Sequence, residues 1–376
     1  MRILSDILYK VKIKAVHGST QVEVANLCQD SRLVAENSLF VAVKGFNVDG
    51  HAYIEKAIDL GAVAIVCQEL PKEINDDVVY VQVADSAEAL ALIACNFYDN
   101  PSEKVKLVAI TGTNGKTSVA TLLWQLYKSL GYQVGLLSTV ENKIGDKVIK
   151  ATHTTPNAIA LNELLAKMVD AGCEFVFIEA SSHAIDQNRT YGLSFDGAVF
   201  TNLTHDHLDY HDTFLEYRNA KKRLFDLLPK TAFALTNADD KNGMVMLQNT
   251  KATQKSYALR TMSDFNAKVL ENDFAGMIMN LDGAEFCSKL IGHFNAYNML
   301  AVYATAILLG NEKMEVLTAM SALQGAEGRF DIVISPREKI VSIVDYAHTP
   351  DALKNVLQTI NAVKHGDKKT ITVVGC

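Results

Sequence analysis

A glycine-containing loop, GTNGKT at residues 112–117, combines residue types that bind a phosphate chain. It follows an apolar, β-rich run at 105–110 and precedes a helical pattern at 118–130. Amide groups at a helix N-terminus attract anions, and the glycines let the backbone approach a phosphate closely. Lys116 can reach the β- and γ-phosphates, and the Thr117 hydroxyl can ligate Mg2+. A chance glycine turn is the alternative, but the strand, loop and helix setting favours a nucleoside triphosphate site.

A carboxylate follows at the end of a later strand-like run. Glu179 comes directly after the apolar residues 175–178. Downstream of a phosphate-binding loop, such a carboxylate typically binds the Mg2+ of a nucleotide. A buried strand end seldom tolerates an unpaired charge, so Glu179 should have a metal or cation partner, with a structural salt bridge as the alternative. The HDH sequence at 205–207 is compatible with zinc, but zinc takes ligands from several segments and no matching Cys/His cluster occurs.

Lys221 lies in a helical pattern at 213–228 and shares its apolar face with Tyr217 and Phe225, whereas Lys222 is expected to point away. A lysine on an apolar face either extends its ammonium group to solvent or is functional. Burial lowers the pKa of a lysine, and a neutral amine can react with carbon dioxide to form a carbamate. Such a carbamate would offer an oxygen anion to a second Mg2+. The residues alone leave both interpretations open.

The elements that position these residues predict an α/β fold. Strand-like and helical runs alternate, which indicates a small unit at 1–101, a large unit with a mostly parallel sheet at 102–328, and the start of a third unit at 329–376. In the third unit, a strand at 341–344, a helix at 351–363 and a strand at 370–374 are expected. A doubly wound domain needs more strands and helices than these, so we expect a fragment of a longer protein.

The bulk composition is that of a globular protein. The chain has 376 residues, 49% hydrophobic and 21% charged, with a net charge of −7, which argues against nucleic-acid binding. The six cysteines fall singly, as in reduced cytosolic proteins. The charged N-terminus does not resemble a signal peptide, and no apolar run reaches transmembrane length. We therefore expect a soluble cytoplasmic monomer without a membrane partner.

Several motifs together resemble the Mur ligase family. These are TGTNGKT at 111–117, EASSHAIDQNR at 179–189, DHLD at 206–209 and the Y-x-x-A-K pattern that ends at Lys221. The resemblance covers essentially the whole chain and, within the family, is greatest to the ligases that add the third residue of the peptidoglycan stem peptide. It implies a three-domain architecture with a central P-loop domain, and here an incomplete last domain.

The resemblance also implies a reaction. A ligase of this kind uses ATP to phosphorylate the D-glutamyl carboxylate of UDP-N-acetylmuramoyl-L-alanyl-D-glutamate, and a diamino acid then attacks the acyl phosphate. The diamino acid would be meso-2,6-diaminopimelate, or alternatively L-lysine. The protein would thereby serve peptidoglycan synthesis, and through it cell wall biogenesis, cell shape and cell division. The region in which the family recognises the diamino acid would lie beyond residue 376.

The resemblance assigns roles residue by residue. It implies ATP contacts at Gly112, Thr113, Asn114, Gly115, Lys116, Thr117, Ser118, Asn295, Arg329 and Asp345. It implies Mg2+ ligands at Thr117, Glu179, His207 and a carbamylated Lys221 (N6-carboxylysine), with Lys116, Lys221 and His207 as catalytic residues. It implies substrate contacts at Gln29, Ser31, Phe46, Asn47, Val48, Thr154, Thr155, Ser181, Gln187 and Arg189. The planar guanidinium group of Arg189 suits a carboxylate.

Other interpretations stay open at this stage. By chemistry alone the segment around Ser31 would be an ordinary turn, and Thr155 before a proline could belong to a helix N-cap. A folylpolyglutamate ligase would share the loop and the lysine, although THTTP at 152–156 and ASSHAIDQNR at 180–189 speak against it. A third hypothesis is a module that binds ATP and a nucleotide sugar without turnover.

Overall fold

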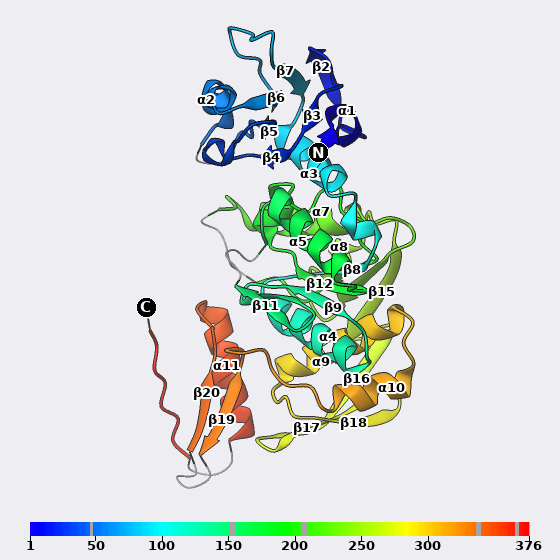
Figure 1. Cartoon of the computed structure of the whole chain (residues 1–376). Helices are drawn as coiled ribbons and strands as arrows, with labels where there is room; N and C mark the ends of the chain where they lie inside the picture. The colour runs from blue at the N-terminus through cyan, green and yellow to red at the C-terminus, as the bar shows by residue number, and fades with distance from the viewer. Residues whose placement is uncertain (46–47, 151–154, 205–209, 336–339, 365–367, 376) are drawn as a thin grey trace.

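The computed structural model describes residues 1–376 except 46–47, 151–154, 205–209, 336–339, 365–367 and 376. Four of the expected site residues, Phe46, Asn47, Thr154 and His207, lie outside the described residues. The described chain forms an N-terminal unit at one end, a large central unit, and a C-terminal segment that lies against the side of the central unit far from the N-terminal unit (Figure 1).

The N-terminal unit is built on a sheet with strand order β2-β7-β6-β5-β4, parallel except for the antiparallel pair β2–β7. Its apolar strand residues pack against α3 on one face and α2 on the other. Its elements are β1 (Arg2–Ile3), α1 (Leu4–Ile7), β2 (Ile13–His17), β3 (Glu23–Val24), β4 (Asn26–Cys28), η1 (Ser31–Leu33), β5 (Ser38–Val41), η2 (Gly50–Tyr53), α2 (Ile54–Asp59), β6 (Ala62–Cys67), β7 (Val79–Val83), α3 (Ser86–Phe97) and η3 (Pro101–Glu103).

The central unit contains a long sheet with strand order β11-β10-β9-β12-β8-β13-β14-β15-β16-β17-β18. The strands from β9 to β16 in that order run parallel, and antiparallel strands flank them at both edges. The elements are β8 (Lys106–Thr111), α4 (Lys116–Ser129), β9 (Val134–Leu137), β10 (Glu141–Ile144), β11 (Lys147–Lys150), α5 (Ala158–Asp170), β12 (Phe175–Glu179), α6 (Ser182–Asp186), β13 (Gly197–Phe200), α7 (Phe214–Asp226), β14 (Phe233–Asn237), α8 (Gly243–Met246), β15 (Thr253–Ala258), β16 (Phe265–Asp273), β17 (Gly276–Leu281), β18 (Ala284–Ser288), α9 (His293–Leu308) and α10 (Lys313–Met320).

Strand β8 lies in the middle of this sheet and is buried on both faces. Leu107 and Ala109 belong to the core under α5, α6, α7 and α8, whereas Val108 and Ile110 belong to the core under α4, α9 and α10. A strand between two helical layers needs apolar side chains at successive positions, because alternate residues point to opposite faces. This requirement explains the continuous apolar run that ends at the phosphate-binding loop.

The neighbours of β8 determine which residues meet beyond its end. Strand β12 pairs with it in parallel, with Glu179 beside Ile110, and β13 pairs with its other side, with Phe200 beside Thr111. Carboxyl ends of parallel strands meet at one edge of a sheet, where α/β proteins bind their ligands. The loop after β8 therefore lies between Glu179 on one side and the segment after Phe200 on the other.

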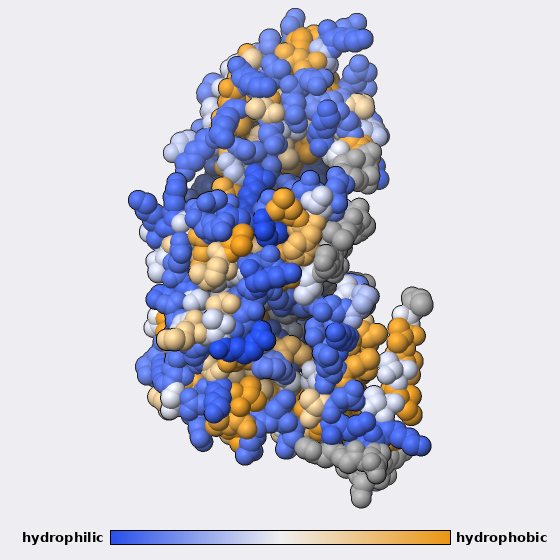
Figure 2. Space-filling model, turned by 180° about the vertical axis from the view of Figure 1, so that it is seen from behind, coloured by the Kyte–Doolittle hydropathy of each residue, from blue (hydrophilic) through white to orange (hydrophobic). Residues whose placement is uncertain are grey.

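The C-terminal segment consists of β19 (Asp331–Ser335), β20 (Ile340–Val344) and α11 (Pro350–Val363). Its contact with the central unit is a small apolar cluster whose buried members are Ile291, Phe330 and Val363. Several apolar residues of the segment are exposed, and they gather along one side of the molecule (Figure 2): Val333, Ile334, Ile340, Val344, Ile371, Val373 and Val374.

The α/β class and the mostly parallel central sheet are confirmed, with small shifts at element ends. The helix expected from residue 118 begins at Lys116. The prediction of a strand at 370–374 is wrong, because these residues form no strand. The expectation that Lys222 points away from the apolar face is wrong. Lys222 is buried, and its ammonium group forms an ion pair with Asp226 one helical turn later. None of the described helices is long and apolar enough to cross a membrane.

The close fit between β13 and β14 gives a test of the central fold. Gly197→Ala should destabilise the central unit by about 1–3 kcal/mol, because the added Cβ would lie 2.2 Å from Cζ of Phe233. Urea unfolding followed by the fluorescence of Trp124, the single tryptophan, measures this loss. Adding Phe233→Leu should recover part of it, since the smaller side chain makes room for the methyl group. Strictly additive losses in the double variant would contradict the predicted clash.

Candidate active site

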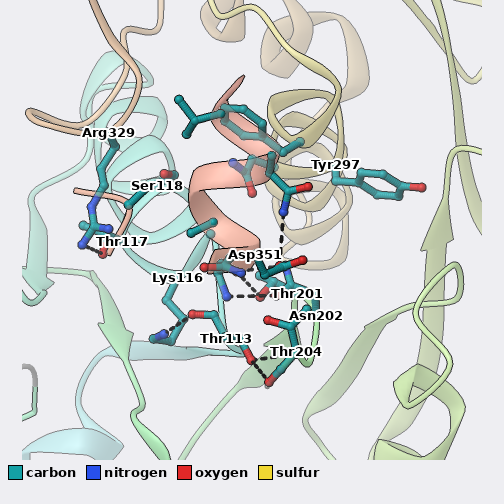
Figure 3. Close-up of a pocket in the computed structure, with 18 of the residues that line it drawn as sticks. Thr113, Lys116, Thr117, Ser118, Thr201, Asn202, Thr204, Tyr297, Arg329 and Asp351 are labelled. Carbon is teal, nitrogen blue, oxygen red and sulfur yellow. Dashed lines mark hydrogen bonds between the residues drawn. The ribbon is translucent and has the colours of Figure 1, made fainter. Parts of the chain in front are cut away.

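A cavity of about 1200 Å³ opens at the carboxyl ends of the central strands. Its floor is the loop at 112–117 with the first turn of α4, and its walls come from the segments after β12, β13 and β14, from α9, and from α11 (Figure 3). Such a volume is large enough for a nucleotide together with part of a second substrate. The cavity therefore lies between the central unit and the C-terminal segment.

Two glycines allow the loop its shape. Gly112 has φ +148° and Gly115 has φ +86°, backbone conformations that other residues rarely adopt. A Cβ on Gly112 would lie 2.0 Å from Oγ1 of Thr201, and one on Gly115 would lie 2.7 Å from Oδ1 of Asn298. Both positions therefore require glycine, for conformation and for space.

The segment after β13 holds the loop in place. The amide of Thr113 donates to the carbonyl oxygen of Asn202 at 2.8 Å, and the amide of Asn114 donates to Oδ1 of Asn202 at 2.9 Å. The Thr201 hydroxyl donates to the Asn114 carbonyl oxygen at 2.6 Å. These contacts pair backbone groups of the loop that belong to no helix or strand. The loop is thus held by the segment after β13, whose Thr201 and Asn202 also line the cavity.

Both candidate catalytic lysines that the structure describes approach one carbonyl group. Nζ of Lys116 donates to the carbonyl oxygens of Gly112 at 3.1 Å and Thr113 at 2.8 Å. Nζ of Lys221 donates to the Gly112 oxygen at 2.9 Å and lies 4.6 Å from the ring centre of Tyr217. Lys221 is only 1% exposed, so it does not extend its ammonium group to solvent. The amine groups of both lysines therefore lie close to the loop that would receive phosphate.

Thr117 and Glu179 form the described part of the expected metal site. Thr117 is 5% exposed and Glu179 is fully buried, and both border the cavity. Within the described part of the chain, Glu179 has no ion pair with a lysine, arginine or histidine, and its carboxylate accepts hydrogen bonds only from Thr139. A buried carboxylate whose described partners are all neutral fits a cation. The described residues contain no group of three or more His, Cys, Asp or Glu side chains arranged for a metal ion.

Arg189 forms the polar centre of the expected substrate region. Its Nη1 donates to the Thr155 carbonyl oxygen at 2.8 Å, and its Nε donates to Oε1 of Gln187 at 3.0 Å. Burial lowers the pKa of this guanidinium group. Arg189, Thr155 and Ser181 line the cavity, whereas Gln187 lies behind Arg189 and donates to the hydroxyl of Tyr210. The guanidinium group is therefore held from behind and borders the cavity that contains the loop.

On α9 the structure distinguishes two asparagines of one motif. Asn295 was expected at the nucleotide, but its side chain donates to the Ile291 carbonyl oxygen at 2.9 Å and does not line the cavity. Asn298 lines the cavity beside Gly115, and its amide donates to Oδ1 of Asn295 at 3.1 Å. Asn295 therefore orients Asn298. Asn298 is the second asparagine of the G-x-x-N-x-x-N pattern at 292–298, so the sequence already contained a signal for it.

Two expected residues come from the start of the C-terminal segment. Nη2 of Arg329 donates to the Thr117 hydroxyl at 3.3 Å (Figure 3), and its guanidinium group lies 4.7 Å from the ring centre of Tyr346. Asp345 accepts the amide of Phe330 at 2.7 Å and borders the cavity. The structure thus brings Arg329 and Asp345 to the phosphate-binding loop, although they are far from it in sequence.

The expected sugar-binding residues of the N-terminal unit lie elsewhere. Of those that the structure describes, Gln29, Ser31 and Val48 do not line the central cavity. Ser31 is 6% exposed in η1, and Val48 is 57% exposed.

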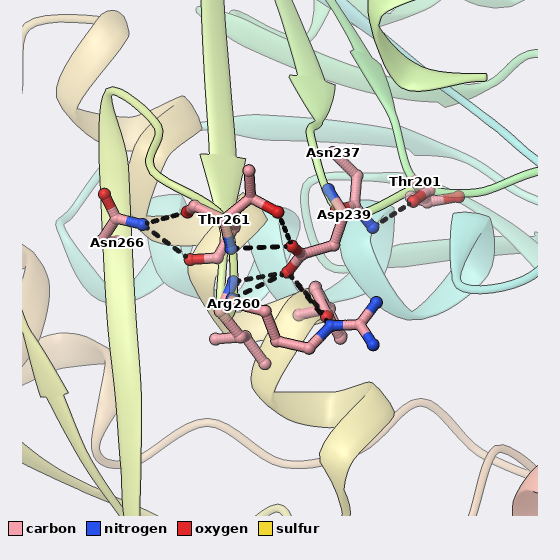
Figure 4. Close-up of polar contacts among 9 residues, drawn as sticks. Thr201, Asn237, Asp239, Arg260, Thr261 and Asn266 are labelled. Carbon is pink, nitrogen blue, oxygen red and sulfur yellow. Dashed lines mark hydrogen bonds and ion pairs between the residues drawn. The ribbon is translucent and has the colours of Figure 1, made fainter. Parts of the chain in front are cut away.

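A buried carboxylate that sequence analysis missed shapes another wall. Asp239 follows β14 and accepts hydrogen bonds from the amides of Leu259, Arg260 and Thr261 and from the hydroxyl of Tyr297 (Figure 4). Burial by itself raises the pKa of Asp239, but the hydrogen bonds outweigh burial and lower the pKa to about 2. The polar NADD stretch at 237–240, at a strand end, was the available signal.

Replacing this carboxylate should cost stability in a pH-dependent way. Asp239→Asn is expected to destabilise the central unit at pH 7 by about 1–3 kcal/mol, because an amide cannot accept all these hydrogen bonds. The folded pKa of about 2 lies below the unfolded value of about 3.9, so the contribution is present above pH 4 and is lost as the pH falls towards 2. Urea unfolding measured by Trp124 fluorescence should show the two proteins converging below pH 4. A difference that stays constant would contradict this origin.

Comparison with known proteins agrees with this geometry. Residues 110–306 match the Mur ligase middle domain, 23–98 match the Mur ligase family catalytic domain, and 328–376 match the Mur ligase glutamate ligase domain. The chain is 56% identical over 374 residues to the UDP-N-acetylmuramoyl-L-alanyl-D-glutamate--2,6-diaminopimelate ligase of Cytophaga hutchinsonii, covering 99% of this chain and 76% of that protein. It is 37% identical to the ligase of the same name from Listeria monocytogenes serotype 4b, over 99% and 77% of the two chains.

Solved structures agree as well. A structure of a UDP-N-acetylmuramoyl-L-alanyl-D-glutamate--2,6-diaminopimelate ligase superposes with a TM-score of 0.82 at 28% identity, covering 96% of this chain and 74% of that one. A folylpolyglutamate synthase from Mycobacterium tuberculosis, complexed with ADP and AMPPCP, shares the fold at a TM-score of 0.58 and 19% identity, over 71% and 69% of the two chains. With relatives this similar over nearly its whole length, the chain belongs to the Mur ligase family.

Proposed function

We propose that this chain is an ATP-dependent ligase that joins 2,6-diaminopimelate to the D-glutamyl carboxylate of UDP-N-acetylmuramoyl-L-alanyl-D-glutamate, a step of peptidoglycan precursor synthesis. The observation that carries the proposal is the shared cavity, in which a phosphate-binding loop, a buried carboxylate and Arg189 border one space. The names of relatives that match 99% of the chain supply the substrates. L-lysine is the alternative amino acid. We also propose that the protein is a cytoplasmic monomer. We place the boundaries between its three domains at 101/102 and 328/329.

The proposed reaction has two steps. The D-glutamyl carboxylate attacks the γ-phosphorus of ATP, the bond to the β-phosphate oxygen breaks, and an acyl phosphate and ADP form. The amine of the diamino acid then attacks the acyl carbon, phosphate leaves, and the amine loses a proton. Lys116 would bind the transferring phosphate, and Arg189 would hold the substrate carboxylate. The C-terminal segment forms one wall of the cavity and would limit the access of water, which otherwise hydrolyses the acyl phosphate.

The metal requirement involves Thr117, Glu179, His207 and Lys221, of which His207 lies outside the described residues. Mg2+ held there would neutralise negative charge on the phosphates. We propose that Lys221 is carbamylated by carbon dioxide, with loss of a proton from its amine. Its burial beside Tyr217 supports this proposal, since water is largely excluded from the Lys221 side chain.

Carbamylation of Lys221 has a direct test. Protein equilibrated with ¹³C-bicarbonate should show a carbamate carbon resonance that disappears in Lys221→Arg, because a guanidinium group does not form this adduct. Lys222→Arg is the matched control, since Lys222 is also buried but is paired with Asp226. The control should keep the resonance. A resonance that survives in Lys221→Arg would assign the adduct to another amine, and its absence from the unaltered protein would refute the modification.

Substrate binding tests the function itself. Calorimetric titration with UDP-N-acetylmuramoyl-L-alanyl-D-glutamate should show saturable binding, weakened about tenfold or more by Arg189→Met, because a charged hydrogen-bond donor to the substrate is lost. Lys167→Met removes an exposed cation from α5 and should leave the affinity unchanged. Binding of ATP without binding of this substrate would refute the proposal and favour a folate substrate. Phosphate release with diaminopimelate, compared with L-lysine, then identifies the amino acid.

A further inference from the structure

Thr139 holds both oxygens of the buried Glu179 carboxylate. Its amide donates to Oε1 at 2.9 Å, and its hydroxyl donates to Oε2 at 2.8 Å. These are the hydrogen bonds to the Glu179 carboxylate among the described residues, and Glu179 also borders the cavity. A carboxylate whose two oxygens both accept hydrogen bonds from one residue cannot rotate freely about its last side-chain bond. Thr139 therefore determines the direction in which the remaining lone pairs point.

The same hydroxyl approaches the second expected metal ligand. Oγ1 of Thr139 lies 3.4 Å from Oγ1 of Thr117. A hydroxyl group has one proton, and that of Thr139 is engaged by Glu179, so the proton between the two threonines belongs to Thr117. Thr117 then donates to Thr139 and keeps its lone pairs for other partners, one of which is Arg329 in this structure. Because a carboxylate can only accept, it determines the direction of both hydrogen bonds: Thr117 donates to Thr139, and Thr139 donates to Glu179.

The fold explains why Thr139 reaches this position. Strand β9 pairs in parallel with β12, and Leu137 lies beside Ile178, so the chain leaving β9 passes the end of β12. The turn there is held by Ser138, whose hydroxyl donates to the carbonyl oxygen of Glu141 at 2.8 Å. The donors of Thr139 therefore come from a neighbouring strand end, as Glu179 itself does.

We propose that Thr139 is a positioning residue for Mg2+, which orients the Glu179 carboxylate and the Thr117 hydroxyl without binding the ion itself. The proposal rests on the proposed function, because it assumes that these two side chains ligate the metal of a nucleotide. Groups that hydrogen-bond to metal ligands orient them and raise metal affinity. Loss of the Thr139 hydroxyl should therefore weaken Mg2+ binding while leaving contacts of the nucleotide with the loop backbone intact.

The experiment measures nucleotide binding and metal binding separately. A non-hydrolysable ATP analogue is titrated into the protein by calorimetry, once with excess Mg2+ and once with EDTA, and Mg2+ is titrated into the protein–analogue complex. Thr139→Val removes the hydroxyl at nearly constant volume, and Thr139→Ser retains it. We expect Thr139→Val to lower the apparent Mg2+ affinity about 10- to 100-fold. Affinity for the analogue in EDTA should not change, and Thr139→Ser should restore Mg2+ affinity.

The outcomes separate this inference from the proposed function. If the unaltered protein shows no Mg2+-dependent gain in analogue binding, the proposed function fails. If that gain is present and Thr139→Val retains it, the role of Thr139 is refuted. Equal weakening in Mg2+ and in EDTA would also refute it, since that pattern indicates a general structural role. Should Thr139→Val fail to fold by circular dichroism, Thr139→Cys, with a weak donor in nearly the same volume, is judged by the same criteria.

Discussion

The site depends on the parallel pairing of three neighbouring strands, β12, β8 and β13. Because their carboxyl ends meet at one edge, the phosphate-binding loop after β8 lies between Glu179 and the Thr201–Asn202 segment. Neither neighbour is close to the loop in sequence. The apolar side chains of β8 pack into the cores on both faces of the sheet and hold the strand between its two neighbours. The positions of the polar site residues therefore depend on the apolar packing of the strands that carry them.

The distribution of charge follows from the same arrangement. Lys116 and Lys221 both donate to the Gly112 carbonyl oxygen, and Arg329 donates to Thr117 in the next turn. Lys116 and Arg329 thus place cationic groups beside a loop that has no carboxylate of its own, whereas Lys221 is the proposed site of a carbamate. A polyphosphate needs such an environment, because its charge must be neutralised in a place of low water content. The Glu179 carboxylate, held by Thr139, is the fixed negative group beside them.

The C-terminal segment forms part of the cavity wall although its apolar contact with the central unit is small. It packs on the central unit through an apolar cluster around Ile291, Phe330 and Val363, and it supplies Arg329, Asp345 and the face of α11 to the cavity wall. Because few buried side chains attach the C-terminal segment to the central unit, a ligand that contacts both parts can shift the equilibrium between their relative orientations. Contacts of a nucleotide with both Lys116 and Arg329 would favour the arrangement in which the cavity is covered.

The sequence by itself determined the α/β class, the loop, the acidic strand end and the position of Lys221 on the apolar face of its helix, because each depends on local residue type and spacing. Only the tertiary structure decided what depends on contacts between distant segments. It placed Asn298 at the cavity with Asn295 behind it, buried Lys222 against Asp226, gathered loop amides on Asp239, and brought Thr139 to Glu179. Hydrogen bonds between strand ends leave no periodic signal in a sequence, since their partners are chosen by the order of strands in the sheet.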